Sequence, residues 1–491
     1  MTDWAYAGVK AITTAIQNQE VSSVEMLHYF QQRITTHNPK LNAVVAQNNT
    51  LAESIARQAD KDIASGNIRG PLHGLPMTIK DTYEVVGFTA TSGARRWQTH
   101  TPATNATAVQ RLLDAGVVPM GKTNVPYMAS DWQSYNRIYG KTNNPWDFSR
   151  TPGGSSGGAA AAVSSGMSVV ELGSDIGGSI RTPAHYCGVF GHKPSSGLIS
   201  LRGHLPGPPG TQSEPDLAVA GPLAQSTDDL ALMLNALAAP DPMAARAWQL
   251  QLPECELKSL DQFRVLAVLE HPLCPIDSKL LQHYRDLITK LRAAGVKVVE
   301  GQPEPVPLDK VYPLFLSLLG GQFSASATPM QRRQVRVLAP IIKRFGRLLK
   351  AGPMMHHYFY GIIQSHAHWL DDNEARAKLL QATESVFTNY DVILTPIVPT
   401  TAIAHDTDSA FHQRRLLVNG QPRPYTDHFP WIAMATALGL PATSAPTGLI
   451  DNHLPCNIQI IGRAYGDRTT LRFSKLLEAI TGGMPRPPQF A

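Results

Sequence analysis

Apolar residues follow two different periods along this chain, one typical of helices and the other of strands. The capping box Ser22-Ser23-Val24-Glu25 precedes apolar residues at helical spacing, so we expect a helix that starts there and ends near Pro39. Short apolar runs predict buried strands at residues 77–79 and 117–120, and residues 51–64 have a helical pattern. Helices that alternate with short apolar strands are typical of an α/β fold.

The same alternation continues in the C-terminal half of the chain. Strands are predicted at residues 265–269, 296–299, 392–396, 442–446 and 457–461, and helices at residues 227–238, 279–294 and 469–480. Because the strand segments are spread along the whole chain, the pattern favours one layered domain over residues 1–491 rather than separate modules.

The composition is that of a globular protein. Of the 491 residues, 43% are hydrophobic and 16% are charged, so the chain can bury a large core. The four cysteines form no metal-binding or disulfide pattern, which favours a reducing compartment. They are Cys187, Cys255, Cys274 and Cys456. Neither a leader peptide nor a long apolar run is present, so we expect a cytoplasmic protein without a transmembrane segment.

The charge is mildly basic and spread along the chain. Lys and Arg number 43 against 38 Asp and Glu, a net charge of +5, and this distribution does not indicate nucleic-acid binding. The densest basic stretch, residues 332–350, interleaves basic and apolar side chains. This pattern is usually a solvated helix face, and it also occurs in helices that lie on a membrane or a partner, so both interpretations stay open.

Residues 140–200 are rich in Gly, Ser, Thr, Asn and Pro, yet they are not a linker. A helix start at residues 159–163 and a strand at 169–172 lie inside this stretch. It also contains two glycine-flanked serines, Ser155 and Ser179. Glycine permits close approach of the backbone, so both hydroxyls can lie in tight turns that face one cleft. Loops of this kind commonly carry functional sites.

A serine nucleophile needs a base and a group that stabilises negative charge. Successive N–H groups in Ile176-Gly177-Gly178-Ser179 could form an oxyanion hole. Lys80 ends an apolar run, where burial would lower its pKa and produce a neutral amine that accepts a proton. No histidine has an obvious pairing position, although His185 and His192 follow in the same region.

Several separate motifs together resemble the amidase signature family. Their order along the chain matches that family, and they cover most of its length: residues 38–43, 74–81, 121–124, 144–147, 153–158, 173–183, 187–194 and 459–462.

The resemblance implies a serine–serine–lysine catalytic set. In it Ser179 is the nucleophile, Lys80 is the base and Ser155 bridges the two, with a cis peptide bond at Gly154–Ser155. The chain would then hydrolyse an amide through a serine acyl-enzyme, and water would release the acid. The implied supporting residues are the oxyanion-hole donors Ile176, Gly177, Gly178 and Ser179, the bracing residues Asp175 and Arg181, and Ser156 in the lysine network.

The family's fold is a single large α/β/α domain in which helices flank both faces of a mixed central sheet. On this resemblance we expect a catalytic core at about residues 70–200, no metal and no cofactor, and a small-molecule amide as the substrate. A homodimer is compatible with the sequence.

Two other functions stay open. Gly153-Gly154-Ser155-Ser156-Gly157 also fits the nucleophile elbow of an α/β-hydrolase esterase, but the polar residues 143–152 do not form the strand that an elbow needs. The amidase-like component of a glutaminyl-tRNA amidotransferase, its A chain, carries the same three catalytic residues. Val125-Pro126-Tyr127-Met128 is more similar to stand-alone amidases than to the acidic pattern of that component.

The substrate is not determined by the motifs. The residues predicted to line the acyl pocket are Tyr127, Met128 and Trp132, with Phe429 and Trp431 as further candidates. Each of them is also an ordinary core residue type. Their apolar character favours an uncharged acyl group that is hydrophobic or aromatic.

Overall fold

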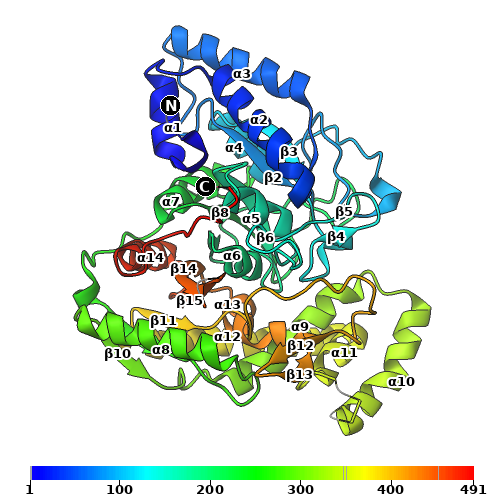
Figure 1. The fold of residues 1–491 in the computed structure, drawn as a ribbon. Coiled ribbons are helices and arrows are strands. Elements are labelled where there is room, and N and C mark those ends of the chain that lie inside the picture. Colours follow the sequence, from blue (N-terminus) through cyan, green and yellow to red (C-terminus); the bar gives the residue numbers. More distant parts are fainter. Residues whose placement is uncertain (1–2, 347, 350, 452, 491) are drawn as a thin grey trace.

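The computed structural model describes residues 3–346, 348–349, 351–451 and 453–490. Its centre is a mixed sheet of eleven strands in the order β1-β3-β2-β6-β8-β7-β14-β15-β11-β9-β10. Helices flank both faces of this sheet (Figure 1). The expected fold class, an α/β/α arrangement around a mixed sheet, is therefore confirmed.

The strands of this sheet are β1 (Val44–Ala46), β2 (Pro76–Lys80), β3 (Val118–Thr123), β6 (Val170–Asp175), β7 (Phe190–Lys193), β8 (Val219–Ala224), β9 (Arg264–Ala267), β10 (Lys297–Glu300), β11 (Val392–Thr395), β14 (Ala442–Ile450) and β15 (Leu454–Ile461). Two short hairpins pair β4 (Tyr135–Asn136) with β5 (Gly140–Lys141) and β12 (Arg415–Val418) with β13 (Gln421–Pro424).

The helices are α1 (Val9–Gln17), α2 (Ser23–Leu41), α3 (Asn49–Ala64), α4 (Thr107–Asp114), α5 (Gly157–Ser164), α6 (Arg181–Cys187), α7 (Thr227–Leu237), α8 (Ser278–Ala293), α9 (Leu308–Ser324), α10 (Pro329–Phe345), α11 (His356–Ile363), α12 (His366–Asn389), α13 (Pro430–Ala437) and α14 (Asp467–Thr481). Among the described residues, no helix is long and apolar enough to cross a bilayer.

The start of α2 was predicted correctly and its end was not. The Ser22 side chain accepts from the N–H of Glu25, while the Glu25 carboxylate accepts from the Ser22 N–H at 2.8 Å, so the capping box forms. The helix continues beyond Pro39 to Leu41. It ends where Asn42 takes a left-handed conformation with φ 53°. A proline in the last turn removes only one helical hydrogen bond, so it does not by itself end the helix.

Two parallel strands lie side by side under the catalytic core. Strand β2 pairs with β6 in parallel, with Thr78 opposite Glu171. Because the carboxyl ends of parallel strands meet at one edge of a sheet, Lys80 and the end of β6 lie together. Helix α5 follows Ser156 and packs on both strands, which brings the first serine loop to the same edge.

The basic stretch forms helix α10 at the periphery of the molecule (Figure 1). A second capping box starts this helix, in which Gln331 N–H donates to Thr328 Oγ1 at 3.2 Å. The basic side chains of Arg333, Lys343 and Arg344 are exposed. The helix also exposes apolar side chains, among them Val337, Ile341 and Phe345, so its outer surface is of mixed character. Residues 347 and 350 of this stretch lie outside the described residues.

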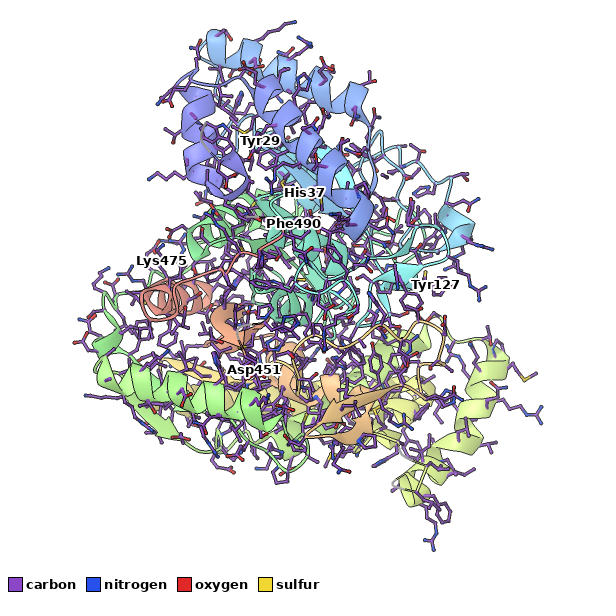
Figure 2. All side chains as sticks on the ribbon, viewed as in Figure 1. Tyr29, His37, Tyr127, Asp451, Lys475 and Phe490 are labelled. Atoms are coloured by element: carbon purple, nitrogen blue, oxygen red, sulfur yellow. The ribbon has the colours of Figure 1, made fainter. Side chains whose placement is uncertain are left out.

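The C-terminal tail returns to the N-terminal helices, where Figure 2 shows Phe490 next to His37. The two rings lie 5.1 Å apart, and Arg33 of α2 donates to the Phe490 carbonyl at 3.1 Å. The buried Phe490 thereby fixes the end of the chain against α2.

Candidate active site

Lys80 ends strand β2 and is completely buried. Its Nζ lies 2.8 Å from Ser155 Oγ, 2.8 Å from Ser156 Oγ and 2.9 Å from Ser174 Oγ. Burial lowers the pKa of Lys80 from its ordinary value to about 7, although the nearby Asp175 and Glu171 raise it in part. A substantial fraction of this lysine is therefore a neutral amine near pH 7, in contact with a serine hydroxyl.

Ser155 and Ser156 precede helix α5 in a loop that packs closely against its neighbours. The peptide bond between Gly154 and Ser155 is cis, as the resemblance implied. A side chain at Gly154 would lie 2.4 Å from the carbonyl of Asp131, so only glycine fits there. This packing fixes the position of Ser155 relative to Lys80.

Ser179 lies in the loop between β6 and α6, on the wall of a large cavity. Its carbonyl accepts from the N–H of Ser156 at 3.1 Å, which joins the two serine loops. The contacts of the described residues include no hydrogen bond between the Ser155 and Ser179 hydroxyls. Such bonds are often long before substrate binds.

The backbone of this loop presents free donors to the cavity. Of the four predicted oxyanion donors, Gly178 instead donates its N–H to Asp175 Oδ1 at 2.9 Å. Within the described part of the chain, the N–H groups of Ile176, Gly177 and Ser179 have no protein acceptor. The residues that carry them also line the cavity, so these three groups are available to a ligand oxygen.

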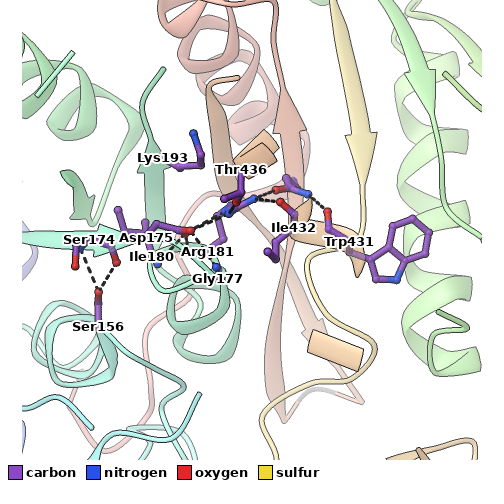
Figure 3. Close-up of polar contacts among 12 residues, drawn as sticks. Ser156, Ser174, Asp175, Gly177, Ile180, Arg181, Lys193, Trp431, Ile432 and Thr436 are labelled. Carbon is purple, nitrogen blue, oxygen red and sulfur yellow. Dashed lines mark hydrogen bonds and ion pairs between the residues drawn. The ribbon is translucent and has the colours of Figure 1, made fainter. Parts of the chain in front are cut away.

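An ion pair between Asp175 and Arg181 holds the shape of the loop (Figure 3). Both side chains are completely buried, and Arg181 Nη2 lies 2.8 Å from Asp175 Oδ1. Although burial alone would raise it, the neighbouring Arg181 and backbone N–H donors lower the pKa of Asp175 to about 2. Arg181 also donates to the Ile432 carbonyl, at 3.0 Å, and to Gln459. Asp175 and Arg181 therefore lie where bracing residues are needed.

Removal of Arg181 should destabilise the fold. In Arg181→Met the charge of Asp175 stays buried without its partner, and breaking a buried ion pair in this way costs about 3–5 kcal/mol. Urea unfolding of the two proteins measures the change. The exposed pair Arg57–Glu53 is the control, because Arg57→Met should leave the unfolding midpoint nearly unchanged. Equal midpoints for Arg181→Met and the unmodified protein would contradict the bracing role.

Sequence analysis missed a buried acid, Glu171, beside the lysine. Thr78 and Thr123 donate their hydroxyls to its carboxylate, the latter at 3.0 Å. Burial raises the pKa of Glu171 to about 8, although Lys122 and Lys80 lower it in part. The available signal was an acidic residue inside an apolar strand.

The two histidines of this region are not placed as bases. The Asn457 N–H donates to His185 Nδ1 at 2.9 Å, and burial lowers the pKa of His185 to about 4. His192 Nε2 lies 3.1 Å from Asp467 Oδ1. The described contacts of both rings include neither Ser155 nor Ser179.

The cavity beside Ser179 has a volume of about 1360 Å³ and a mostly apolar wall. Three of the predicted pocket residues, Tyr127, Trp132 and Phe429, line it. Tyr127 both lines the cavity and is 56% exposed, so it lies where the wall meets solvent. Trp132 is buried and donates its Nε1–H to the Gly177 carbonyl at 2.8 Å, and its ring lies 4.6 Å from that of Phe429.

The other two predicted pocket residues are not part of this wall. The Met128 sulfur lies 3.5 Å from Arg96 Nη2, and its backbone has φ 55°. Trp431 belongs to helix α13 and is buried in the core. The apolar character of a residue could not show from the sequence whether it lies in the core or lines the cavity.

The local structure does not support an α/β-hydrolase elbow at Ser155. An elbow places its serine between a strand and a helix. Helix α5 does follow Ser155, but the described residues 142–156 contain no strand.

Comparisons with known proteins identify the family of this chain. The family model described as Amidase matches residues 25–471. The A component of the glutamyl-tRNA(Gln) amidotransferase of Carboxydothermus hydrogenoformans is 32% identical over 97% of this chain and 97% of its own length.

Two solved structures have the same fold. One, described as part of a vestigial protein complex that reveals the origins of an s-triazine catabolic enzyme, has a TM-score of 0.78 and 26% identity, with 98% of this chain and 99% of that one covered. The other, a bacterial aryl acylamidase, has a TM-score of 0.80 and 22% identity, with 99% and 97% covered, and so shows the fold alone. The family model and the amidotransferase relative establish that this chain belongs to the amidase family, whose members hydrolyse the carbon–nitrogen bonds of amides.

Proposed function

We propose that the protein hydrolyses a small-molecule amide with a hydrophobic or aromatic acyl group, using Ser179 as the nucleophile, Ser155 as the bridge and Lys80 as the base. The observation that carries this proposal is the 2.8 Å contact between the buried Lys80 Nζ and Ser155 Oγ, next to a cavity that Ser179 lines. Lys80, whose pKa burial lowers to about 7, is the only basic side chain among the described residues that contacts Ser155.

The first half of the reaction forms an acyl-enzyme. Neutral Lys80 takes the proton of Ser155, Ser155 takes that of Ser179, and Ser179 Oγ bonds to the amide carbon. The carbonyl oxygen becomes negative and receives hydrogen bonds from the free N–H groups of the nucleophile loop. The relay then returns the proton to the amide nitrogen as the carbon–nitrogen bond breaks, and ammonia or an amine leaves.

Water completes the cycle. The same relay removes a proton from water while its oxygen attacks the acyl carbon, and the proton then passes to Ser179 Oγ as the ester bond breaks. The products are the carboxylic acid and the regenerated serine, so the steps need no oxidant, reductant or cofactor.

The wall of the cavity favours an uncharged, apolar acyl group. Four aromatic side chains line the cavity near the loop that carries Ser179: Trp132, Phe429, Tyr425 and Phe411. Helices α9, α10 and α11, with the residue just before α11, add apolar side chains: Leu319, Phe323, Leu338, Ile342, Met355 and Phe359. A pocket of this chemistry gains affinity from burying apolar surface.

A second candidate is the amidase-like component of a tRNA-dependent amidotransferase. The sequence identity with such a protein over nearly the whole chain favours this candidate. That function would require recognition of glutamine, whose ammonium group needs a carboxylate partner. In the described wall, Asp131 is the only acid, and it already pairs with Arg414 at 2.5 Å and accepts from Tyr425 at 2.8 Å. We therefore rank the small-molecule amidase first.

We also propose that the protein acts in the cytoplasm as one domain over residues 1–491. The free thiols of its cysteines and the spread of the central sheet from β1 to β15 support this proposal.

A panel of amides tests the substrate class. Ammonia release from phenylacetamide, hexanamide, acetamide and L-glutamine should give a kcat/KM at least about tenfold higher for the first two, because each apolar group buried in the pocket adds binding energy. A preference for glutamine, especially one that depends on an added partner protein, would support the second candidate and overturn the first.

Trp132→Ala tests whether the aromatic wall selects the acyl group. It should lower kcat/KM for phenylacetamide about 10–100-fold and change the value for acetamide much less. Trp248→Ala is the matched control, because Trp248 is 70% exposed and lies outside the cavity wall. An equal loss for both substrates in Trp132→Ala would show that this side chain supports the loop rather than selecting the acyl group.

A further inference from the structure

Two polar side chains that no sequence motif indicated extend the hydrogen-bond network of Lys80 away from the cavity. Ser174 Oγ lies 2.9 Å from Lys80 Nζ, and His204 Nε2 lies 2.9 Å from the same Ser174 oxygen. His204 therefore contacts the lysine through one hydroxyl. It does not line the cavity, so it is not placed to touch substrate.

The hydrogen bonds around Lys80 determine where its lone pair can point. A neutral amine has two hydrogens and one lone pair, and the Nζ atom has three hydroxyl neighbours within 2.9 Å and the Ser174 carbonyl at a longer 3.3 Å. The Ser156 hydroxyl donates to the Ser174 carbonyl at 3.3 Å, so its oxygen accepts one Lys80 hydrogen. If Ser174 Oγ accepts the other hydrogen, the lone pair is left for the Ser155 proton.

The neutral His204 ring supplies the acceptor that this arrangement needs. Burial, together with the positive charges of Lys80 and Lys122, lowers the pKa of His204 well below its ordinary value. In the tautomer with its proton on Nδ1, the neutral imidazole accepts a hydrogen bond at Nε2 from the Ser174 hydroxyl. Ser174 Oγ then has its lone pairs free for Lys80.

We propose that His204 is a positioning residue that turns the Ser174 hydroxyl away from Lys80 and so directs the lysine lone pair at Ser155. This inference rests on the proposed role of Lys80 as a neutral base. Without an acceptor at residue 204, the Ser174 hydroxyl turns toward Lys80 and donates to its lone pair, which then no longer takes the Ser155 proton.

The fold holds the imidazole firmly in place. Its ring packs against the edge of the buried Tyr83 ring, with 4.8 Å between the centroids. The Tyr83 hydroxyl donates to the Gly173 carbonyl at 2.7 Å, beside Ser174. Gly203 has φ +76°, and a side chain there would lie 2.7 Å from the Cα of Ala106. The loop therefore packs against the start of α4 only with glycine before His204.

The test compares a variant that loses the acceptor with one that keeps it. His204→Leu should lower kcat for an amide about tenfold and leave KM unchanged, because one oriented hydrogen bond is lost away from the substrate. His204→Gln should restore most of kcat, since its amide oxygen can accept at the Nε2 position. In a Ser174→Ala background, His204→Leu should have no further effect.

Controls separate this role from a loss of structure. His28→Leu changes an exposed histidine of α2 and should keep full kcat. If His204→Leu unfolds at a lower temperature than the unmodified protein, His204→Asn replaces it, because the shorter amide does not reach Ser174 Oγ. Unchanged kcat in the folded variant, failure of His204→Gln to restore it, or additive effects with Ser174→Ala would each overturn the proposal.

The same assay distinguishes this inference from the function that it rests on. If Lys80→Ala retains full activity, the lysine relay itself is wrong. If Lys80→Ala is inactive while His204→Leu is normal, only the role of His204 is wrong.

Discussion

Ser179→Ala should reduce amide turnover about a million-fold, the loss typical of removing a serine nucleophile. The loop that carries Ser179 also presents the free N–H groups of Ile176 and Gly177 to the cavity, so the proposed nucleophile and the proposed oxyanion donors lie at one place. The variant should also lose covalent labelling by a fluorophosphonate probe, which reacts with activated serines. Mass spectrometry of the labelled peptide from the unmodified protein should identify Ser179.

Two other serines serve as comparisons. Ser155→Ala should also lose turnover, because it breaks the path from Lys80 to Ser179. Ser130→Ala should keep both turnover and labelling, since Ser130 lines the same cavity but its hydroxyl only donates to the Tyr127 carbonyl. A probe adduct on Ser155 in the unmodified protein would favour an elbow mechanism and contradict the assignment of Ser179.

The sequence predicted those parts of the fold in which local pattern and final environment agree. Strands β2 and β3 are apolar runs, and they are buried on both faces. Strand β8 was not predicted: Gly221 and Pro222 interrupt its short apolar run, whereas in β3 the apolar residues 117–120 include a proline but still form a continuous run before Gly121. Strand β8 forms because the chain places it between β6 and β7 in the centre of the sheet. Pairing with its neighbours in the sheet, which no local pattern encodes, therefore determines that this segment forms a strand.

The same limit applies to the candidate site. Lys80, Ser155 and Ser179 could be found because each lies in a local motif. Ser174 could not, because its contact with Lys80 depends on the parallel pairing of β2 with β6, and the only sign of Glu171 was an acid inside an apolar strand. His204 lies 30 residues beyond Ser174, in a proline-rich loop with no catalytic pattern. Residues that tune a site through others are thus visible only in three dimensions.

The pH dependence of the reaction should report the protonation of Lys80. A protonated lysine cannot accept a proton, so kcat/KM for an amide should rise with pH through the lysine pKa, about 7, and be lost below it. The direction follows from burial, which disfavours the charged form of a lysine. A base with an ordinary lysine pKa would instead give a rate that keeps rising above pH 10.

Lys193 offers a matched control for this profile. It is also completely buried, and burial lowers its pKa to about 7 as well, but its Nζ donates to the carbonyls of Pro194 and Leu440 and not to a serine. Lys193→Met should therefore leave the midpoint of the pH–rate profile unchanged, even if the protein becomes less stable. If the midpoint disappears in Lys193→Met, the pH dependence reports Lys193 and not Lys80.

Lys80→Ala should lower the amide rate about a thousandfold or more, the usual contribution of a positioned base. The loss should be smaller for an activated ester such as a p-nitrophenyl ester, because its leaving group needs no proton from the relay. Lys80→Arg should not restore activity, since a guanidinium stays charged at any usable pH. Full amide activity in either variant would show that the base lies elsewhere. An equal loss for amide and ester would show that Lys80 acts only in the attack of Ser179 and not in protonation of the leaving nitrogen.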